Sequence, residues 1–148
     1  MFTNYTINKL TTIHYPAILK LWEASVRATH HFLAEPDIQA YKSLLSDAHF
    51  DQLQLFGVTG EKGELKGFIA IEDKKIQMLF ISPAARGTGI GKALINYVFQ
   101  HLHVKTVDVN EQNLQAYDFY KYLGFAVTER SEFDGIGKPF PIISMKLP

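Results

Sequence analysis

A glycine-rich segment in the middle of the chain constrains the fold more than any other feature. The segment ISPAARGTGIGKAL runs from Ile81 to Leu94 and joins an apolar, strand-like run to a helix-like one. Its glycines alternate with other residues, and glycine lets the backbone approach a ligand closely with φ values that other residues resist. Amide groups at the start of a helix, together with the helix dipole, favour a bound anion. The spacing therefore predicts a strand, a phosphate-binding turn and a helix.

Three phosphate-binding patterns can be compared with this segment. A P-loop fails because Arg86 and Ala93 stand where the pattern requires a glycine and a hydroxyl residue. A dinucleotide fingerprint is a near miss, because Lys92 stands where its small third residue packs. The pattern R-x-x-G-x-G is matched fully, by Arg86, Gly89 and Gly91. With the positive charge of Arg86 and Lys92, the loop is suited to the pyrophosphate of an adenylate-bearing cofactor.

The composition indicates a folded chain without thiol chemistry. Of 148 residues, 47% are hydrophobic, so we expect one domain spanning residues 1–148. Fifteen basic residues balance fifteen acidic ones, and we therefore expect no nucleic-acid or membrane partner. The absence of cysteine excludes a disulfide scaffold, a thiolate zinc site and a catalytic thiol, and fits a cytoplasmic location. No histidine or carboxylate spacing suggests a ligand set, so we expect no metal site.

The order of predicted elements indicates the fold class. Apolar periodicity predicts helices from Pro16 to Val26, over 36–45, over 90–102 and over 113–122, the last ending at Gly124. Strands are predicted over 5–8, 53–58, 65–71, 76–81, 105–109, 125–128 and 141–146. The strands first form a meander and then alternate with helices. This order predicts an α/β protein with a mixed (α+β) sheet.

A second motif carries a resemblance to a known family. The stretch NLQAYDFYKYLGF runs from Asn113 to Phe125, about twenty residues after the glycine segment. The two together resemble the signatures of the GCN5-related N-acetyltransferase (GNAT) family, the second of which reads N-x-x-A-x-x-F-Y-x-x-x-G-F. The stretches ATHHFL, VNEQN and RSEFDGIGKPFP, from Ala28, Val109 and Arg130, resemble one bacterial subgroup of that family. The resemblance spans most of the chain.

The resemblance implies a fold, a cofactor and a set of binding residues. The fold would be a mostly antiparallel central sheet with splayed central strands, flanked by helices, and the cofactor would be acetyl-CoA. By this resemblance the pantetheine arm pairs with the backbone at Leu79, Phe80 and Ile81. The pyrophosphate would lie on Arg86, Gly87, Thr88, Gly89, Ile90, Gly91 and Lys92. Near the thioester the resemblance places Asn113, Ala116 and Tyr120.

The residues also permit the chemistry of acetyl transfer. A lysine-like amine has a pKa of about 10.4, so making it neutral at pH 7 costs roughly 4–5 kcal/mol, which a general base can supply. A backbone N–H of the central strand could stabilise the charge on the carbonyl. Tyr120 is the candidate acid that protonates the departing thiolate. Without cysteine, direct transfer in a ternary complex is the simplest scheme.

The general base is left open by the sequence. Gln77 stands where relatives often have a carboxylate, and an amide cannot take up the proton. The first candidate is Glu111, at the end of the strand over 105–109. The other candidates are His30 and His31, with Glu23 and Asp134 as weaker ones.

We expect the acceptor to be a primary amine of a small molecule, a peptide or a protein. Aromatic residues that could wall its pocket, or simply pack in the core, are Trp22, Phe32, Tyr41 and Phe133. The glycine-containing loop over 133–139 is suited to shaping the same end. One alternative is a sensor that binds acyl-CoA without turnover, and another is a nucleotide-dependent oxidoreductase. The oligomeric state is left open, with a homodimer as one expectation because dimers are common in similar proteins.

Overall fold

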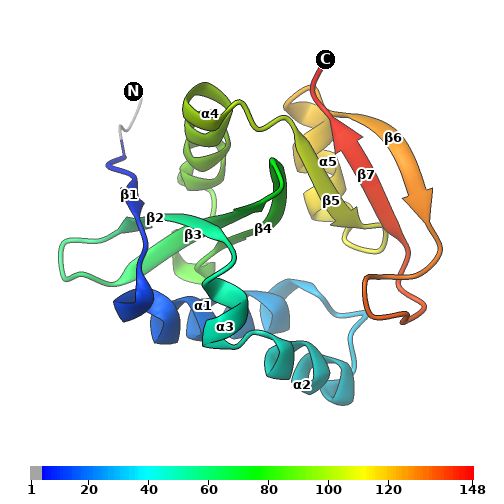
Figure 1. Cartoon of the computed structure of the whole chain (residues 1–148), viewed down its shortest axis with the longest axis horizontal. Helices are drawn as coiled ribbons and strands as arrows, with labels where there is room; N and C mark the ends of the chain where they lie inside the picture. Colours follow the sequence, from blue (N-terminus) through cyan, green and yellow to red (C-terminus); the bar gives the residue numbers. More distant parts are fainter. Residues whose placement is uncertain (1–4) are drawn as a thin grey trace.

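Seven strands form one mixed sheet in the order β1-β2-β3-β4-β5-β7-β6 in the computed structural model, which describes residues 5–148 (Figure 1). The strands are β1 (Asn8–Lys9), β2 (Gln54–Thr59), β3 (Leu65–Glu72), β4 (Lys75–Ile81), β5 (Thr106–Asn110), β6 (Ala126–Ser131) and β7 (Ile142–Lys146). Neighbouring strands are antiparallel except for β4 and β5, which are parallel. The predicted α/β class with a mostly antiparallel mixed sheet is confirmed.

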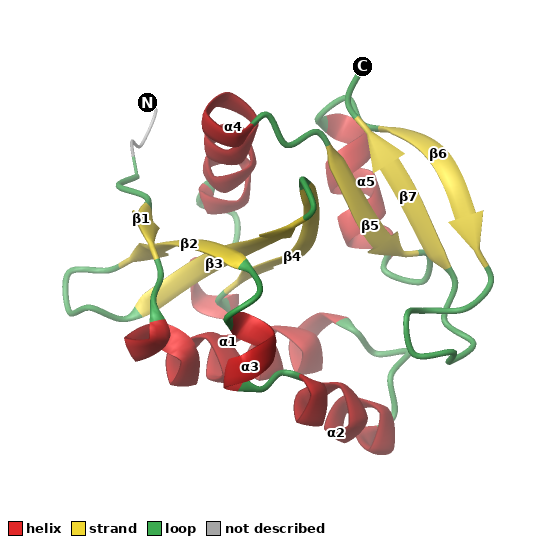
Figure 2. Ribbon diagram, in the orientation of Figure 1, coloured by secondary structure: helices red, strands yellow, loops and turns green. Residues whose placement is uncertain are grey.

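Helices cover both faces of this sheet (Figure 2). The helices α1 (Tyr15–Thr29), α2 (Glu35–Leu44) and α3 (Asp47–Phe50) lie on one side, and α4 (Ile90–Leu102) and α5 (Leu114–Tyr122) on the other. Alternation along β3 divides its side chains between the two layers. Phe68 and Ala70 pack in the core under α1, whereas Ile69 and Ile71 pack in the core under α4. Two short 3₁₀ turns, Thr12–His14 and Pro83–Ala85, precede α1 and follow β4.

The sheet opens between β4 and β5. These strands pair only at Lys75 with Thr106 and at Ile76 with Val107, and then diverge. The register between β3 and β4 shifts next to this point, so that Gln77 is an extra residue without a partner in β3. A bulge bends its strand, and the remainder of β4 therefore has an unpaired edge that faces away from β3.

Most predicted elements are present, with three corrections. The first strand, predicted over 5–8, is instead the two-residue β1, which pairs with Phe56 and Gly57 of β2. Helix α3 was not predicted, although Ser46 caps it by accepting a hydrogen bond of 3.2 Å from the N–H of His49. The strand predicted over 125–128 is β6, which runs further, to Ser131. Within residues 5–148, each helix is too short or too polar to cross a bilayer.

Candidate active site

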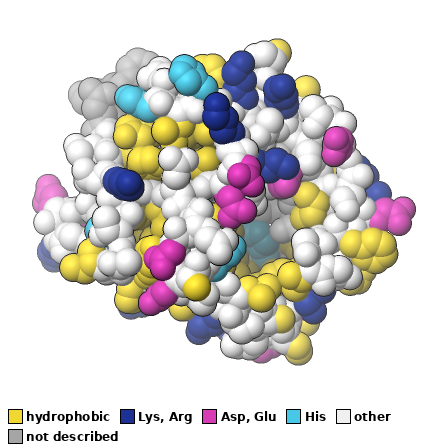
Figure 3. Space-filling view, in the orientation of Figure 1, with side chains coloured by type: hydrophobic (Ala, Val, Ile, Leu, Met, Phe, Trp, Pro, Cys, Tyr) yellow, Lys and Arg dark blue, Asp and Glu magenta, His cyan; other side chains and the backbone are white. Residues whose placement is uncertain are grey.

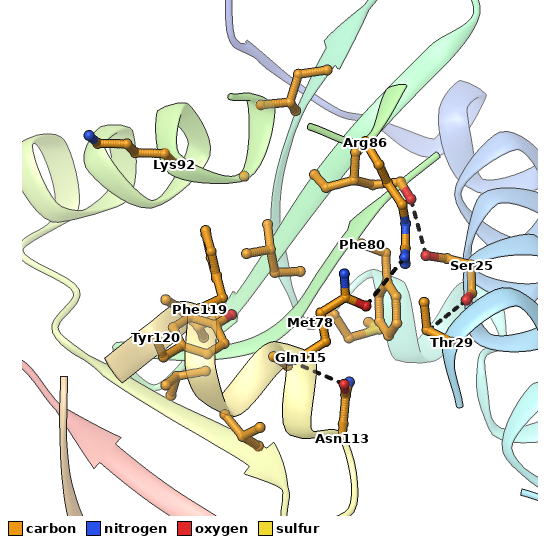
Figure 4. A pocket seen from close by; sticks show the side chains of 18 of the residues that line it. Ser25, Thr29, Met78, Phe80, Arg86, Lys92, Asn113, Gln115, Phe119 and Tyr120 are labelled. Atoms are coloured by element: carbon orange, nitrogen blue, oxygen red, sulfur yellow. Dashed lines mark hydrogen bonds between the residues drawn. The ribbon is translucent and has the colours of Figure 1, made fainter. Parts of the chain in front are cut away.

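A cleft of about 400 Å³ occupies the opening between β4 and β5 (Figures 3 and 4). Its walls come from the last turns of α1, from β4 and β5, from the glycine loop and from the first turns of α4 and α5. The residues that the resemblance assigns to the cofactor all line this cleft, and they are Leu79, Phe80, Ile81, Arg86, Gly87, Thr88, Gly89, Ile90, Gly91, Lys92, Asn113, Ala116 and Tyr120. The fold thus brings the whole predicted set together, while the role of each residue stays a prediction.

The glycine loop has an unusual backbone that leaves space above it. Gly87 and Gly89 have φ values of +73° and +85°, and no atom lies within 4 Å of a Cβ built at either position. These glycines therefore serve the backbone conformation and an open surface, not close packing. Gly89 is the N-cap of α4 and offers no side-chain cap, so the first amides of the helix are free to bind an anion. The Tyr5 hydroxyl braces the loop by donating to the Thr88 carbonyl at 2.5 Å.

The unpaired edge of β4 supplies backbone groups to the cleft. Just after the end of β4, the N–H of Ser82 donates to the carbonyl of Lys66 in β3 at 2.8 Å. In an antiparallel pair, residues alternate between those that bond to the partner strand and those that do not. The backbone groups of Leu79 and Ile81 consequently point to the open edge, and the Ser25 hydroxyl already donates to the Ile81 carbonyl at 3.1 Å.

Phe80 departs from the expected pairing with the pantetheine arm. By the same alternation its backbone groups belong to the ladder with Phe68 in β3. Its side chain lines the cleft instead, with the ring centroid 5.9 Å from that of Phe68. Phe80 therefore offers the cleft an apolar side chain, and its backbone groups are already used within the sheet.

Tyr120 lies at the floor of the cleft, on α5. Its ring meets those of Phe119 and Phe125 edge-on, with centroid distances of 5.4 and 5.3 Å. Burial raises the pKa of the Tyr120 hydroxyl well above its usual range, so the phenol is protonated at neutral pH. Across residues 5–148 no side chain or carbonyl accepts its hydrogen. The hydroxyl is therefore a donor available to a group in the cleft (Figure 4).

Glu111 is placed differently from what the sequence predicted. It is not among the residues that line the cleft, and its carboxylate accepts two hydrogen bonds from Arg130, at 2.5 and 3.1 Å. The Arg130 guanidinium holds the pKa of Glu111 below its ordinary value. Because its carboxylate lies outside the cleft, Glu111 is poorly placed to accept a proton from a reaction inside it, and the structure argues against Glu111 as the base.

The weaker base candidates are engaged elsewhere. Glu23 forms ion pairs with Lys42 at 2.6 Å and Arg27 at 2.9 Å, and these bonds lower its pKa. Asp134 accepts hydrogen bonds from the Tyr41 hydroxyl and from backbone amides of its own loop. His31 is exposed and does not line the cleft. None of the three is positioned to take a proton from a group bound in the cleft.

The cleft contains a carboxylate that the sequence analysis missed. Among the described residues that line it, Asp108 on β5 is the sole aspartate or glutamate. Its Oδ2 lies 3.2 Å from Lys75 Nζ, and its Oδ1 accepts a 2.7 Å hydrogen bond from the Ser144 hydroxyl. The available signal was the strand pattern, because Asp108 lies between the buried Val107 and Val109 and must point to the other face of the sheet.

The predicted aromatic wall divides into core and surface. Trp22 is buried under the sheet and packs in the core, which was one of the two alternatives for this residue. Phe32 lies with its ring centroid 5.8 Å from that of Phe140, and so connects the end of α1 to the loop before β7. Phe133 is 54% exposed, and its side chain is not among those lining the cleft.

The loop between β6 and β7 is fixed to α2. Lys138 forms an ion pair with Asp37 at 3.0 Å, and Tyr41 donates to Asp134. Figure 1 shows this loop beside the connection between α1 and α2, at one end of the opening between the sheet halves. The contacts of Lys138 and Asp134 therefore hold this loop against α2.

The sequence as a whole matches a known family of enzymes. A family model described as the acetyltransferase (GNAT) domain matches residues 23–147, a span that contains the glycine loop, both diverging strands and α5. The chain belongs to the GNAT family of acetyltransferases. The resemblance inferred from the two signatures, and the splayed sheet that it implied, are thereby confirmed.

Similar proteins define the GNAT subgroup. The peptidyl-lysine N-acetyltransferase YjaB of Salmonella typhimurium is 38% identical over 131 residues, which cover 88% of this chain and 90% of that protein. The solution structure of apo YjaB from Escherichia coli has a TM-score of 0.86 at 32% identity, covering 97% of both chains. The PaiA N-acetyltransferase of Thermoplasma acidophilum, solved with coenzyme A, shares the fold with a TM-score of 0.71 at 21% identity, covering 97% of this chain and 99% of that one. The bacterial subgroup indicated by the three stretches is thus the one that contains YjaB.

Proposed function

We propose that this GNAT protein transfers the acetyl group of acetyl-CoA to the side-chain amine of a lysine in a peptide or protein. The observation that carries the proposal is the cleft itself, where every residue assigned to the cofactor by the family signatures meets. The lysine acceptor is supported by similarity to relatives named peptidyl-lysine N-acetyltransferases. Direct transfer in a ternary complex is the simplest scheme, because the chain contains no cysteine to carry an acyl-thiol intermediate.

The residues present fit an extended cofactor with a diphosphate. The free amides at the start of α4, with Arg86 and Lys92, are suited to the diphosphate, and the empty space at Gly87 and Gly89 admits it. Arg86 reaches across the mouth of the cleft toward α5, where its Nη1 lies 3.5 Å from Gln115 Oε1 (Figure 4). The open edge of β4 offers hydrogen-bonding groups to the amides of the pantetheine arm.

The chain supplies proton transfer and charge stabilisation. When bound, acetyl-CoA supplies the acetyl group as a thioester. The N–H of Leu79, at the open edge of β4, is positioned to stabilise negative charge on a carbonyl oxygen in the cleft. Tyr120 donates its proton to the leaving thiolate. Asp108, as the carboxylate of the cleft, accepts the proton of the amine, directly or through one water.

A thiol-release assay with acetyl-CoA and a panel of amines tests this function. The panel contains a peptide with one internal lysine and a blocked N-terminus, the same peptide with arginine instead, and a small diamine. We expect release with the lysine peptide alone, and an acetyl group on its Nε by mass spectrometry. Release with only the diamine would show that the acceptor class is wrong. Binding of acetyl-CoA without release by any amine would favour the non-catalytic sensor.

A further inference from the structure

A chain of side-chain hydrogen bonds connects the end of α1 to the start of α5. The Thr29 hydroxyl lies 2.8 Å from the Ser25 carbonyl and 2.8 Å from His30 Nδ1. On the other side of the ring, His30 Nε2 lies 3.3 Å from Asn113 Nδ2. Asn113 is the N-cap of α5, and its Oδ1 lies 3.2 Å from the backbone nitrogen of Ala116. The two helices form opposite walls of the cleft (Figure 4).

Only one arrangement of protons satisfies every bond in this chain. A carbonyl cannot donate, so the single hydroxyl hydrogen of Thr29 points to Ser25. His30 Nδ1 must then carry a hydrogen, which it donates to the Thr29 oxygen. At the other end, the Ala116 amide fixes which atom of the Asn113 side chain is the oxygen, so Nδ2 faces the ring. His30 Nε2 is therefore the unprotonated nitrogen, and it accepts from Asn113.

The surroundings of His30 hold the ring in this state. The residue is buried, with 8% of its surface exposed, and its ring lies 5.4 Å from Phe32 and 6.0 Å from Phe80 between centroids. Burial, together with the charges of Arg86 and His31, lowers the pKa of His30 to about 4. The imidazole is thus neutral at pH 7. A group with so low a pKa is a weak proton acceptor, which argues against the role of general base considered for His30.

We propose that His30 is a positioning residue that holds Asn113 in the orientation required to bind acetyl-CoA. The ring fixes one hydrogen of Asn113 Nδ2, and the second hydrogen has no acceptor among residues 5–148. Because Asn113 lines the cleft, that hydrogen is available to an amide carbonyl of the pantetheine arm. His30 also connects the two walls where the sheet itself is open. This inference rests on the proposed function, because it assigns a role within the same cofactor site.

A double-mutant cycle tests the coupling between His30 and Asn113. His30→Phe keeps a ring of similar size in an aromatic environment but removes both nitrogens. Loss of one neutral hydrogen bond predicts a roughly three- to tenfold rise in the Kd of acetyl-CoA for His30→Phe and for Asn113→Ala, measured by calorimetry. The double variant should bind no more weakly than Asn113→Ala alone. His101→Phe, on the exposed far end of α4, is the matched control and should bind like the wild type.

The outcomes separate this inference from the proposed function. Additive effects in the cycle, or unchanged affinity of folded His30→Phe, overturn the inference while the function stands. A wild type that binds no acetyl-CoA overturns the function and the inference with it.

A second pair of variants and a spectroscopic signature test the direction of the bonds. Thr29→Val removes the hydroxyl with little change in shape, and Thr29→Ser retains it. We expect Thr29→Val to weaken acetyl-CoA binding about as much as His30→Phe, and Thr29→Ser to bind like the wild type. In the unliganded wild type, ¹⁵N NMR of the labelled ring should show His30 protonated at Nδ1. A proton at Nε2, or equal weakening by both Thr29 variants, overturns the assignment.

Discussion

Tyr120 owes its proposed role to burial in an aromatic setting. The rings of Phe119 and Phe125 exclude water from it, which favours the neutral phenol. Asp108 is the proposed complementary group, a carboxylate on β5 that lines the same cleft. The proposed donor and the proposed acceptor of protons thus lie on two elements, α5 and β5, that line the cleft.

Paired substitutions at these residues should separate chemistry from binding. Tyr120→Phe and Asp108→Asn each remove one proton-transfer group and keep the shape of the side chain. We expect each to lower kcat by about 10²-fold or more, the usual contribution of general acid–base catalysis, while the Kd of acetyl-CoA changes by less than about threefold. Steady-state kinetics and calorimetry supply the two measurements.

Tyr117→Phe is the control for this pair, because Tyr117 lies on the same helix and does not line the cleft. Its kcat should equal that of the wild type. A wild-type rate in Tyr120→Phe would remove the acid role, and a wild-type rate in Asp108→Asn would remove the base role.

The proposed anion site is a property of the joined elements β4 and α4. Several amide groups share one surface here because two glycines with positive φ follow β4 and α4 begins without a side-chain cap. No single residue could produce this arrangement. Contacts from outside the loop, such as that of Tyr5 with Thr88, hold this shape before any ligand binds. A preformed site of this kind lowers the entropy cost of binding.

Gly89→Val should disrupt this surface. Valine strongly disfavours a φ of +85°, and its side chain would occupy the space above the loop. We expect the Kd of acetyl-CoA to rise by at least about tenfold, together with a loss of roughly 1–3 kcal/mol in the free energy of unfolding. Calorimetry and denaturant unfolding give these two values.

Gly63→Val separates strain from ligand binding. Gly63 has a φ of +80° and equally open surroundings, but it lies in the turn between β2 and β3. The same substitution there should cost similar stability and leave the affinity for acetyl-CoA unchanged. Equal affinity of the two valine variants would contradict the assignment of the loop.

The whole molecule consists of two sheet halves with a narrow connection. β1 to β4 form one half and β5, β7 and β6 the other, and the halves pair at only two residue pairs. A ligand in the opening contacts both halves, including β4 and the start of α5. Binding therefore adds contacts across the weakest part of the sheet.

Acetyl-CoA should consequently stabilise the entire fold. A ligand at 100 times its Kd adds about 2.7 kcal/mol to the free energy of unfolding. For a chain of this size, that corresponds to a rise in Tm of roughly 5–10 °C, measurable by calorimetric unfolding. NAD at the same concentration is the control and should give no rise. Equal protection by NAD would instead favour the nucleotide-dependent oxidoreductase.

The sequence by itself determined most of the elements and the conformation of the glycine loop. Local patterns decide these features: apolar periodicity predicts β3, β4, α4 and α5, and positive φ follows from glycine at 87 and 89. Helix α3 escaped prediction because four residues hold too little periodicity, and its stability comes from the burial of Phe50.

Only the tertiary structure decided which polar side chains share the cleft. Glu111 and Asp108 are three residues apart, yet one pairs with Arg130 outside and the other lines the opening. The hydrogen bond between His30 and Asn113 joins residues 83 positions apart. Such distances in sequence carry no local signal, because the partner of a side chain depends on strand pairing and on the divergence of β4 and β5, which the packing of the whole sheet sets.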